Sequence, residues 1–185
     1  MKTIDELDKH IGSFIQGGFG QADMAIMKEE AEKLKPGDVY VEIGVDEGRS
    51  ARVAHEYCPE GVYKIFIDIH DPTHTPNLNR AEFMEQEGMV GIGKRGFYIH
   101  GDADQFGYLI LNKLVYFGIS QEKAKFVDLL FIDGHHDYES VKWNTIAWEL
   151  FVKKDGIILF HDYDHPDTRR WLDERYGDNK EILHN

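Results

Sequence analysis

The stretch Val39-Tyr-Val-Glu-Ile-Gly-Val-Asp-Glu-Gly-Arg-Ser-Ala-Arg-Val-Ala-His55 decides the fold. Its first part, residues 39–45, is mostly β-branched or aromatic, which is typical of a buried strand. Gly44 then permits a tight turn, and Gly48 lets the backbone come close to a ligand or to the next strand. From Arg49 onward, small and apolar residues recur at helical spacing. Strand, glycine turn and helix together predict a nucleotide site, in which loop amides and the helix N-terminus face the ligand.

The spacing of the glycines discriminates between cofactors. A dinucleotide site needs Gly-x-Gly-x-x-Gly, and the middle glycine is missing here, which disfavours a nicotinamide dehydrogenase. The pattern Glu42-x-Gly44-x-x-x-Gly48-x-Ser50 instead resembles motif I of the class I S-adenosylmethionine (SAM) dependent methyltransferases. SAM has no pyrophosphate to hold, and an acid suits its cationic methionine end. The alternative is another kind of α/β domain with a glycine-containing turn, so the rest of the chain must decide.

A second strand is expected over residues 62–69, and it carries Asp68 near its end. With the helix between them, residues 39–69 form a right-handed βαβ unit. An acid at this point is placed to accept hydrogen bonds from ribose hydroxyls. The alternative for Asp68 is a turn residue at the strand end.

Length and composition indicate one globular domain over residues 1–185, with N-terminal helices in 1–36 and a Rossmann-like core in 37–185. No long apolar run predicts a membrane span, and the first residues lack the apolar core of a signal peptide. A single cysteine fits a reducing compartment, so we expect a cytoplasmic protein. The net charge of −13 makes nucleic acid a poor partner.

The remaining chain continues the alternation of helix and strand, which predicts a doubly wound, mostly parallel α/β sheet with helices on both faces. The helix over 139–152 is expected to turn Trp143 inward with its apolar side chains. Further helices are expected within 3–35 and over 79–87, 104–117 and 168–176, and further strands over 97–100, 126–132, 157–160 and 181–184.

Polar residues follow three of these strands. Asp102, just past the third strand, is placed to reach an adenine amino group; the alternative is a helix N-cap. Two further clusters follow the fourth and fifth strands, at the edge where open α/β sheets bind ligands. They are Asp133/His135/His136/Asp137 and His161/Asp162/Asp164/His165.

Carboxylates and imidazoles at one sheet edge have two chemical uses. They can bind a divalent cation, which lowers the pKa of a hydroxyl group and orients it. A histidine can also act as the general base that accepts the hydroxyl proton. The alternative is a set of solvated turn residues, in which Asp137 is the best candidate for a helix cap.

The two clusters carry a wider resemblance. Asp133-Gly-His-His-Asp-Tyr, a helix, and then His161-Asp-Tyr resemble the family of macrolide and aminocoumarin sugar O-methyltransferases, over about residues 38–170. In that family a metal aspartate matches Asp133, and paired acids match His161 and Asp162. One acid of the pair is therefore histidine here.

The resemblance implies a SAM-dependent O-methyltransferase of a small polar, sugar-like hydroxyl compound. Magnesium or another divalent cation would be held by Asp133, Asp162 and His161, with His136 or His161 as the catalytic base. The residues expected to bind SAM are Glu42, Gly44, Gly48, Ser50, Asp68, Asp102 and Asp133.

The C-terminal part departs from the class I pattern. Residues after Tyr163 fit one helix and one strand, whereas these enzymes usually close the sheet with two further strands. An open edge of this kind favours a homodimer. The rival functions are a metal-dependent hydrolase that uses the histidine and aspartate clusters, and a binding module without catalytic activity.

Overall fold

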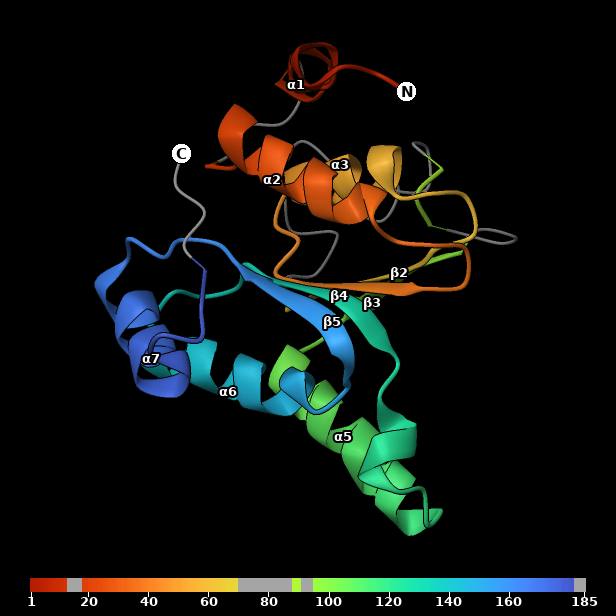
Figure 1. The fold of residues 1–185 in the computed structure, drawn as a ribbon, viewed down its shortest axis with the longest axis vertical. Coiled ribbons are helices and arrows are strands. Elements are labelled where there is room, and N and C mark those ends of the chain that lie inside the picture. Colours follow the sequence, from red (N-terminus) through yellow and green to blue (C-terminus); the bar gives the residue numbers. More distant parts are fainter. Residues whose placement is uncertain (13–17, 70–87, 91–94, 182–185) are drawn as a thin grey trace.

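The computed structural model describes residues 1–12, 18–69, 88–90 and 95–181, and it has three layers, with a parallel sheet between two layers of helices (Figure 1). The strand order is β3-β2-β1-β4-β5, which confirms the doubly wound α/β fold. The strands are β1 (Val39–Ile43), β2 (Tyr63–Asp68), β3 (Gly96–His100), β4 (Val127–Ile132) and β5 (Val152–Phe160). One face carries α1 (Ile4–Gly12), α2 (Gln21–Glu32) and α3 (Arg49–Tyr57), and the other carries α5 (Ala103–Tyr116), α6 (Tyr138–Glu149) and α7 (Pro166–Tyr176). A 3-10 turn, η1 (Gln121–Ala124), precedes β4.

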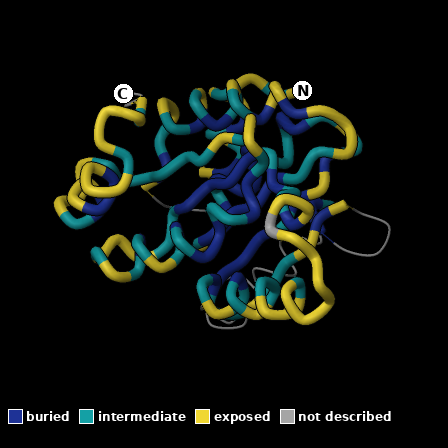
Figure 2. The backbone as a smooth tube through the Cα atoms, turned by 60° about the horizontal axis from the view of Figure 1, so that its bottom comes forward, coloured by how far each residue is buried: buried dark blue, intermediate teal, exposed yellow. Residues whose placement is uncertain are grey.

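The central strands divide their side chains between the two helical layers. In β1, Tyr40 packs into the core beneath α1, α2 and α3, whereas Val41 and Ile43 pack into the core above α5 and α6. The alternation follows from the two-residue period of a strand. The strands form the buried centre of the molecule in Figure 2. Each large apolar side chain buried there contributes roughly 2 kcal/mol to the stability of the fold.

The N-terminal helices expected within residues 3–35 are confirmed as α1 and α2. Their apolar stripes, which include Leu7 and Met24, are fully buried against α3. Among the described helices, none is both long enough and apolar enough to cross a lipid bilayer.

The parallel ladder continues one residue past the central strands. The Gly44 amide donates to Ile67 O at 2.9 Å, and the Asp133 amide donates to Ile43 O at 2.8 Å. The His161 amide likewise donates to Ile132 O at 3.1 Å. The loops after β1 and β4 diverge to opposite faces of the sheet, so a crevice opens between them at the topological switch point.

The expectation for residues 152–156 was wrong. The helix was expected to reach Val152 and the strand to start at Ile157, but Val152 already pairs with Val127 of β4. The chain then bulges out and rejoins the ladder where Ile157 pairs with Leu129. Among the described strands, β5 has a neighbour on one side only, and a homodimer across the other side stays a prediction. The expected helix over 79–87 and most of the strand over 181–184 lie outside the described residues.

A buried carboxyl group joins β1 to α3. Glu42 is 0% exposed, and its two oxygens accept hydrogen bonds from Ser50 Oγ at 2.6 Å and Tyr40 OH at 2.7 Å. Burial raises the pKa of Glu42 to about 8, with the charges of Asp133 and Asp68 adding to the effect and the two hydrogen bonds opposing it. Glu42 is therefore largely protonated in the folded protein at neutral pH.

Replacement of Gly44 by alanine should strongly destabilise the protein. Gly44 has φ of +81°, and a Cβ atom there would lie 2.2 Å from the backbone oxygen of Asp133. Neither backbone segment can move without breaking the ladder, so we expect Gly44→Ala to lower the free energy of unfolding by more than about 3 kcal/mol. Urea denaturation measures this. Gly101→Ala is the control, because no atom lies within 4 Å of its Cβ position, and a similar loss there would contradict the argument.

The buried carboxyl of Glu42 should make stability depend on pH. The unfolded chain releases this proton near the ordinary value of 4.5, and the folded protein keeps it up to about pH 8. Because the folded state binds the extra proton in this window, its stability falls as pH rises from about 4.5 to 8 and is level above that. Glu42→Gln stays neutral, so it should gain roughly 2–4 kcal/mol over the wild type between pH 5 and pH 8.5. Urea denaturation across this range tests it, with the exposed Glu60→Gln as control; parallel wild-type and Glu42→Gln curves would contradict it.

Candidate functional site

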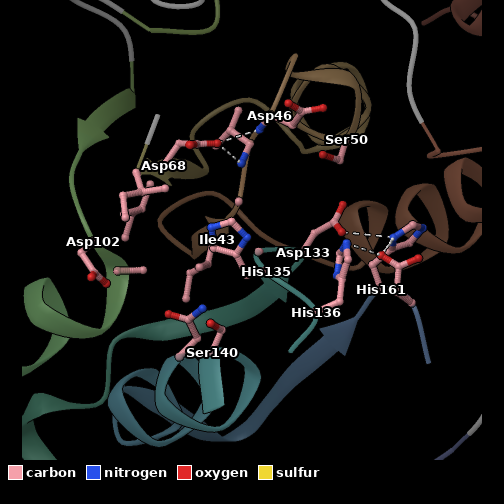
Figure 3. A pocket seen from close by; sticks show the side chains of 18 of the residues that line it. Ile43, Asp46, Ser50, Asp68, Asp102, Asp133, His135, His136, Ser140 and His161 are labelled. Atoms are coloured by element: carbon pink, nitrogen blue, oxygen red, sulfur yellow. Dashed lines mark hydrogen bonds and ion pairs between the residues drawn. The ribbon is translucent and has the colours of Figure 1, made fainter. Parts of the chain in front are cut away.

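A cavity of about 540 Å³ lies at the carboxyl ends of the strands, within the size range of small-molecule sites. Figure 3 shows its two ends: Asp102 lies at one, and His161 lies at the other. Asp68 and Asp46 lie between them. The cavity therefore crosses the switch point predicted from the order of the strands.

Asp68 holds the loop after β1 in place. Its Oδ2 accepts hydrogen bonds from the amides of Val45 at 2.8 Å and Asp46 at 2.7 Å. The side chain is 4% exposed and lines the cavity. Asp68 therefore has the structural role of a turn residue at the strand end. Its expected contact with a ribose stays a prediction.

The other residues of the glycine loop have different positions. Gly48 adopts φ of +83° and begins α3, and Ser50 lines the cavity. Glu42 lies behind Ser50 and reaches the cavity only through the hydroxyl of that residue, because its own side chain is completely buried. The contact of Glu42 with the methionine end of SAM stays a prediction, and Ser50 is the residue through which Glu42 meets the cavity.

The end of the cavity near β3 contains Asp102. Its Oδ1 accepts a hydrogen bond from the Asp104 amide at 3.3 Å, so it is the N-cap of α5 and also lines the cavity. Trp143 corrects an expectation: it is 41% exposed and lines the cavity rather than the core. The inward tryptophan of α6 is Trp148, whose indole nitrogen donates to Ala103 O at 2.7 Å.

Three carboxylates surround His161 at the opposite end. Its Nδ1 lies 2.9 Å from Asp162 Oδ2 and 3.1 Å from Asp133 Oδ1, and its Nε2 lies 3.7 Å from Asp23 Oδ2. Burial opposes a charge on the ring, but the bonds to these carboxylates prevail and raise the pKa of His161 to about 12. The ring is therefore an imidazolium at neutral pH.

The two carboxylates that share His161 differ in their environment. Burial raises the pKa of Asp133, against the effect of the hydrogen bond from His161. Asp162 is less buried, and the hydrogen bond from His161 lowers its pKa. Asp162 also has φ of +53°, in the left-handed region where a side chain costs energy, which is typical of residues held at functional sites.

His136 completes the cluster. Its Nε2 lies 3.2 Å from Asp162 Oδ2, and its side chain is 43% exposed at the cavity. Asp133, His136 and Asp162 each offer one ligand atom within 4.8 Å of the others, which suits a divalent cation. His161, expected as a metal ligand, lies beside this group as the partner of both carboxylates.

The neighbouring residues of the two clusters are placed as follows. His135 lines the cavity. Asp137 accepts a hydrogen bond from the Ser140 amide at 3.1 Å and is the N-cap of α6, which confirms its expected role as a helix cap. His165 packs against His136 with 5.9 Å between ring centroids.

Sequence reasoning did not find two residues of the site. Phe19 lines the cavity, and Asp23 faces His161 from the first turn of α2. From the sequence, the glycine-rich break at residues 17–21 was a candidate lid over the cofactor, with a plain connector as the alternative, but neither Phe19 nor Asp23 was named as a site residue. No spacing rule relates that break to the end of β5, because the contact arises from packing of the N-terminal helices.

The comparisons with known proteins agree with this geometry. A family described as a methyltransferase domain matches residues 41–163, and no curated protein matches the chain. MycE, a methyltransferase of the mycinamycin biosynthetic pathway, was solved with Mg and S-adenosylhomocysteine (SAH). It is 17% identical, with a TM-score of 0.57 over 96% of this chain and 45% of MycE. Its complex with Mg, SAH and mycinamycin VI gives 16% identity and a TM-score of 0.59 over 91% of this chain and 39% of MycE.

An SAH-bound Podospora anserina methyltransferase, PaMTH1, is 18% identical, with a TM-score of 0.55 over 85% of this chain and 61% of that one. The chain thus spans less than half the length of MycE, and at these identities the structures show a common fold. The family match covers most of the sheet, the first polar cluster, and His161 and Asp162 of the second. The chain therefore belongs to the methyltransferase-domain family and has the Rossmann-like fold of the class I SAM-dependent methyltransferases.

Proposed function

We propose that the chain binds SAM and transfers its methyl group to a hydroxyl of a small polar, sugar-like acceptor. The observation that supports this most is the layout of one cavity, in which Asp68 lies between Asp102 at one end and the pair of His136 and Asp162 at the other. With the adenine of a bound SAM near Asp102 and its ribose near Asp68, the sulfonium lies on the side of His136 and His161. MycE, with its bound Mg, SAH and mycinamycin VI, supports the same class of acceptor.

The reaction needs a base as well as an aligned methyl group. The acceptor oxygen attacks the methyl carbon, the carbon–sulfur bond breaks, and sulfur keeps the electron pair to give SAH. The hydroxyl proton must leave in the same process. His136 is the better base, because Asp162 Oδ2 lies 3.2 Å from its Nε2 and can orient the ring toward the acceptor proton. His161 already carries its proton, so it orients Asp133 and Asp162.

A divalent cation also fits the residues of this end. Asp133 and Asp162 would hold it beside His136, and it would lower the pKa of a bound acceptor hydroxyl. Magnesium, as in MycE, prefers oxygen ligands, which favours binding through the two carboxylates and leaves His136 as the base.

Calorimetric titration with SAH tests the cofactor assignment. We expect micromolar binding to the wild type in either Mg²⁺ or EDTA, because the cation group lies at the acceptor end. Asp68→Ala should weaken SAH about 30–100-fold, the loss of charge-assisted hydrogen bonds to a ribose. Asp137→Ala is the matched control: it also removes a carboxylate that accepts a backbone amide, but one outside the cavity lining. Absence of SAH binding by the wild type would remove the proposal and favour a metal-dependent hydrolase.

Replacement of His136 should separate chemistry from cofactor binding. We expect His136→Asn to lower methyl transfer to a panel of sugars at least about 100-fold, because the variant lacks the proposed base for the hydroxyl proton. SAH affinity should stay within about twofold, since His136 lies at the acceptor end. His165→Asn serves as control, because that ring packs on His136 without lining the cavity. Unchanged turnover in His136→Asn would overturn its role as base.

A further inference from the structure

Phe19 belongs to the cavity although it lies outside the segment that the methyltransferase family matches, residues 41–163. The side chain is 6% exposed. Its ring centroid lies 5.5 Å from that of His161 and 5.8 Å from that of Phe131. Phe19 therefore forms a wall at the His161 end of the cavity.

The position of Phe19 is fixed from three helices. Arg49, the first residue of α3, donates from Nε to the Phe19 carbonyl at 2.6 Å, and its Nη2 forms an ion pair with Asp8 of α1. On the other side, Asp23 of α2 accepts a hydrogen bond from the Gly20 amide at 2.7 Å. We call the two interactions of Arg49, with the Phe19 carbonyl and with Asp8, the Arg49 clamp. The clamp leaves the ring little freedom to turn away.

The direction of a bound SAM follows from the proposed function. With adenine near Asp102 and ribose near Asp68, the methionine arm must run along the loop after β1 toward His161 (Figure 3). Arg49 follows that loop and holds Phe19 beside it. The arm and the Phe19 ring therefore occupy the same end of the cavity, whereas the nucleoside lies at the other end.

We propose that Phe19 is the binding residue that covers the methionine arm of SAM, with the Arg49 clamp as its positioning device. The inference rests on the proposed function and extends it to a residue outside the matched family segment. A ring of this size excludes water from the arm and adds apolar contact along its methylene groups. An adenosine ligand, which lacks the arm, does not use this contact.

The test compares SAH with adenosine on the same variants by displacement calorimetry. We expect Phe19→Ala to weaken SAH about tenfold and to leave adenosine within about twofold. Phe19→Leu keeps an apolar side chain and should fold as the wild type. Its affinity for SAH should fall less than that of Phe19→Ala, and its affinity for adenosine should not change. Asp8→Asn, which loosens the clamp and lines no part of the cavity, should weaken SAH in the same selective way. Phe117→Ala is the control, because that side chain is 70% exposed and does not line the cavity.

Each outcome decides between the two proposals. Selective loss of SAH affinity in the Phe19 and Asp8 variants supports the inference. Unchanged SAH affinity in Phe19→Leu and Phe19→Ala overturns it, and so does an equal loss of SAH and adenosine, which would mean that Phe19 supports the whole cavity. A wild-type protein that binds neither ligand overturns the proposed function itself, and the inference with it.

Discussion

The register of the parallel sheet is the constraint on which the rest of the structure depends. Because β1 pairs with β2 on one side and with β4 on the other, the three strands end at one level, and the ladder continues into Gly44 and Asp133. A slip of one residue would exchange the two cores and turn Glu42 away from Ser50. It would also move Asp133 away from His161. Strand pairing therefore sets the positions of the site residues, and the hydrogen bonds between their side chains then fix the side-chain orientations.

This explains what the sequence could predict. Each strand was visible as an apolar run, and each polar residue directly after a run had to lie at the same edge of a parallel sheet. The position of Gly44, Asp68, Asp102 and Asp133 at this edge could therefore be predicted, and all four line the cavity, whereas their contacts with SAM stay predictions. The cap role of Asp137 was found for the same reason, since a helix N-terminus needs an acceptor within three residues.

What escaped prediction depends on contacts between distant segments. Trp143 and Trp148 both lie on α6, and only the packing of α5 decides that Trp148 turns inward while Trp143 faces the cavity. The bulge after Val152 follows from pairing with Val127, which no local pattern indicates. Phe19 and Asp23 meet His161 because α1 and α2 pack on α3, far along the chain from β5. The protonation of His161 likewise needs three carboxylates from three elements, so no spacing rule reveals it.

The bulge in β5 has a consequence for the mouth of the cavity. Residues 153–156 leave the ladder, so regular pairing is confined to the four residues 157–160, and His161 follows at once. A strand added at this edge, from any source, has only that short segment to pair with, and one of its ends must come level with His161 and Asp162. The open edge of the sheet and this end of the cavity are therefore structurally coupled. A strand added at this edge would therefore border the end of the cavity that contains His161 and Asp162.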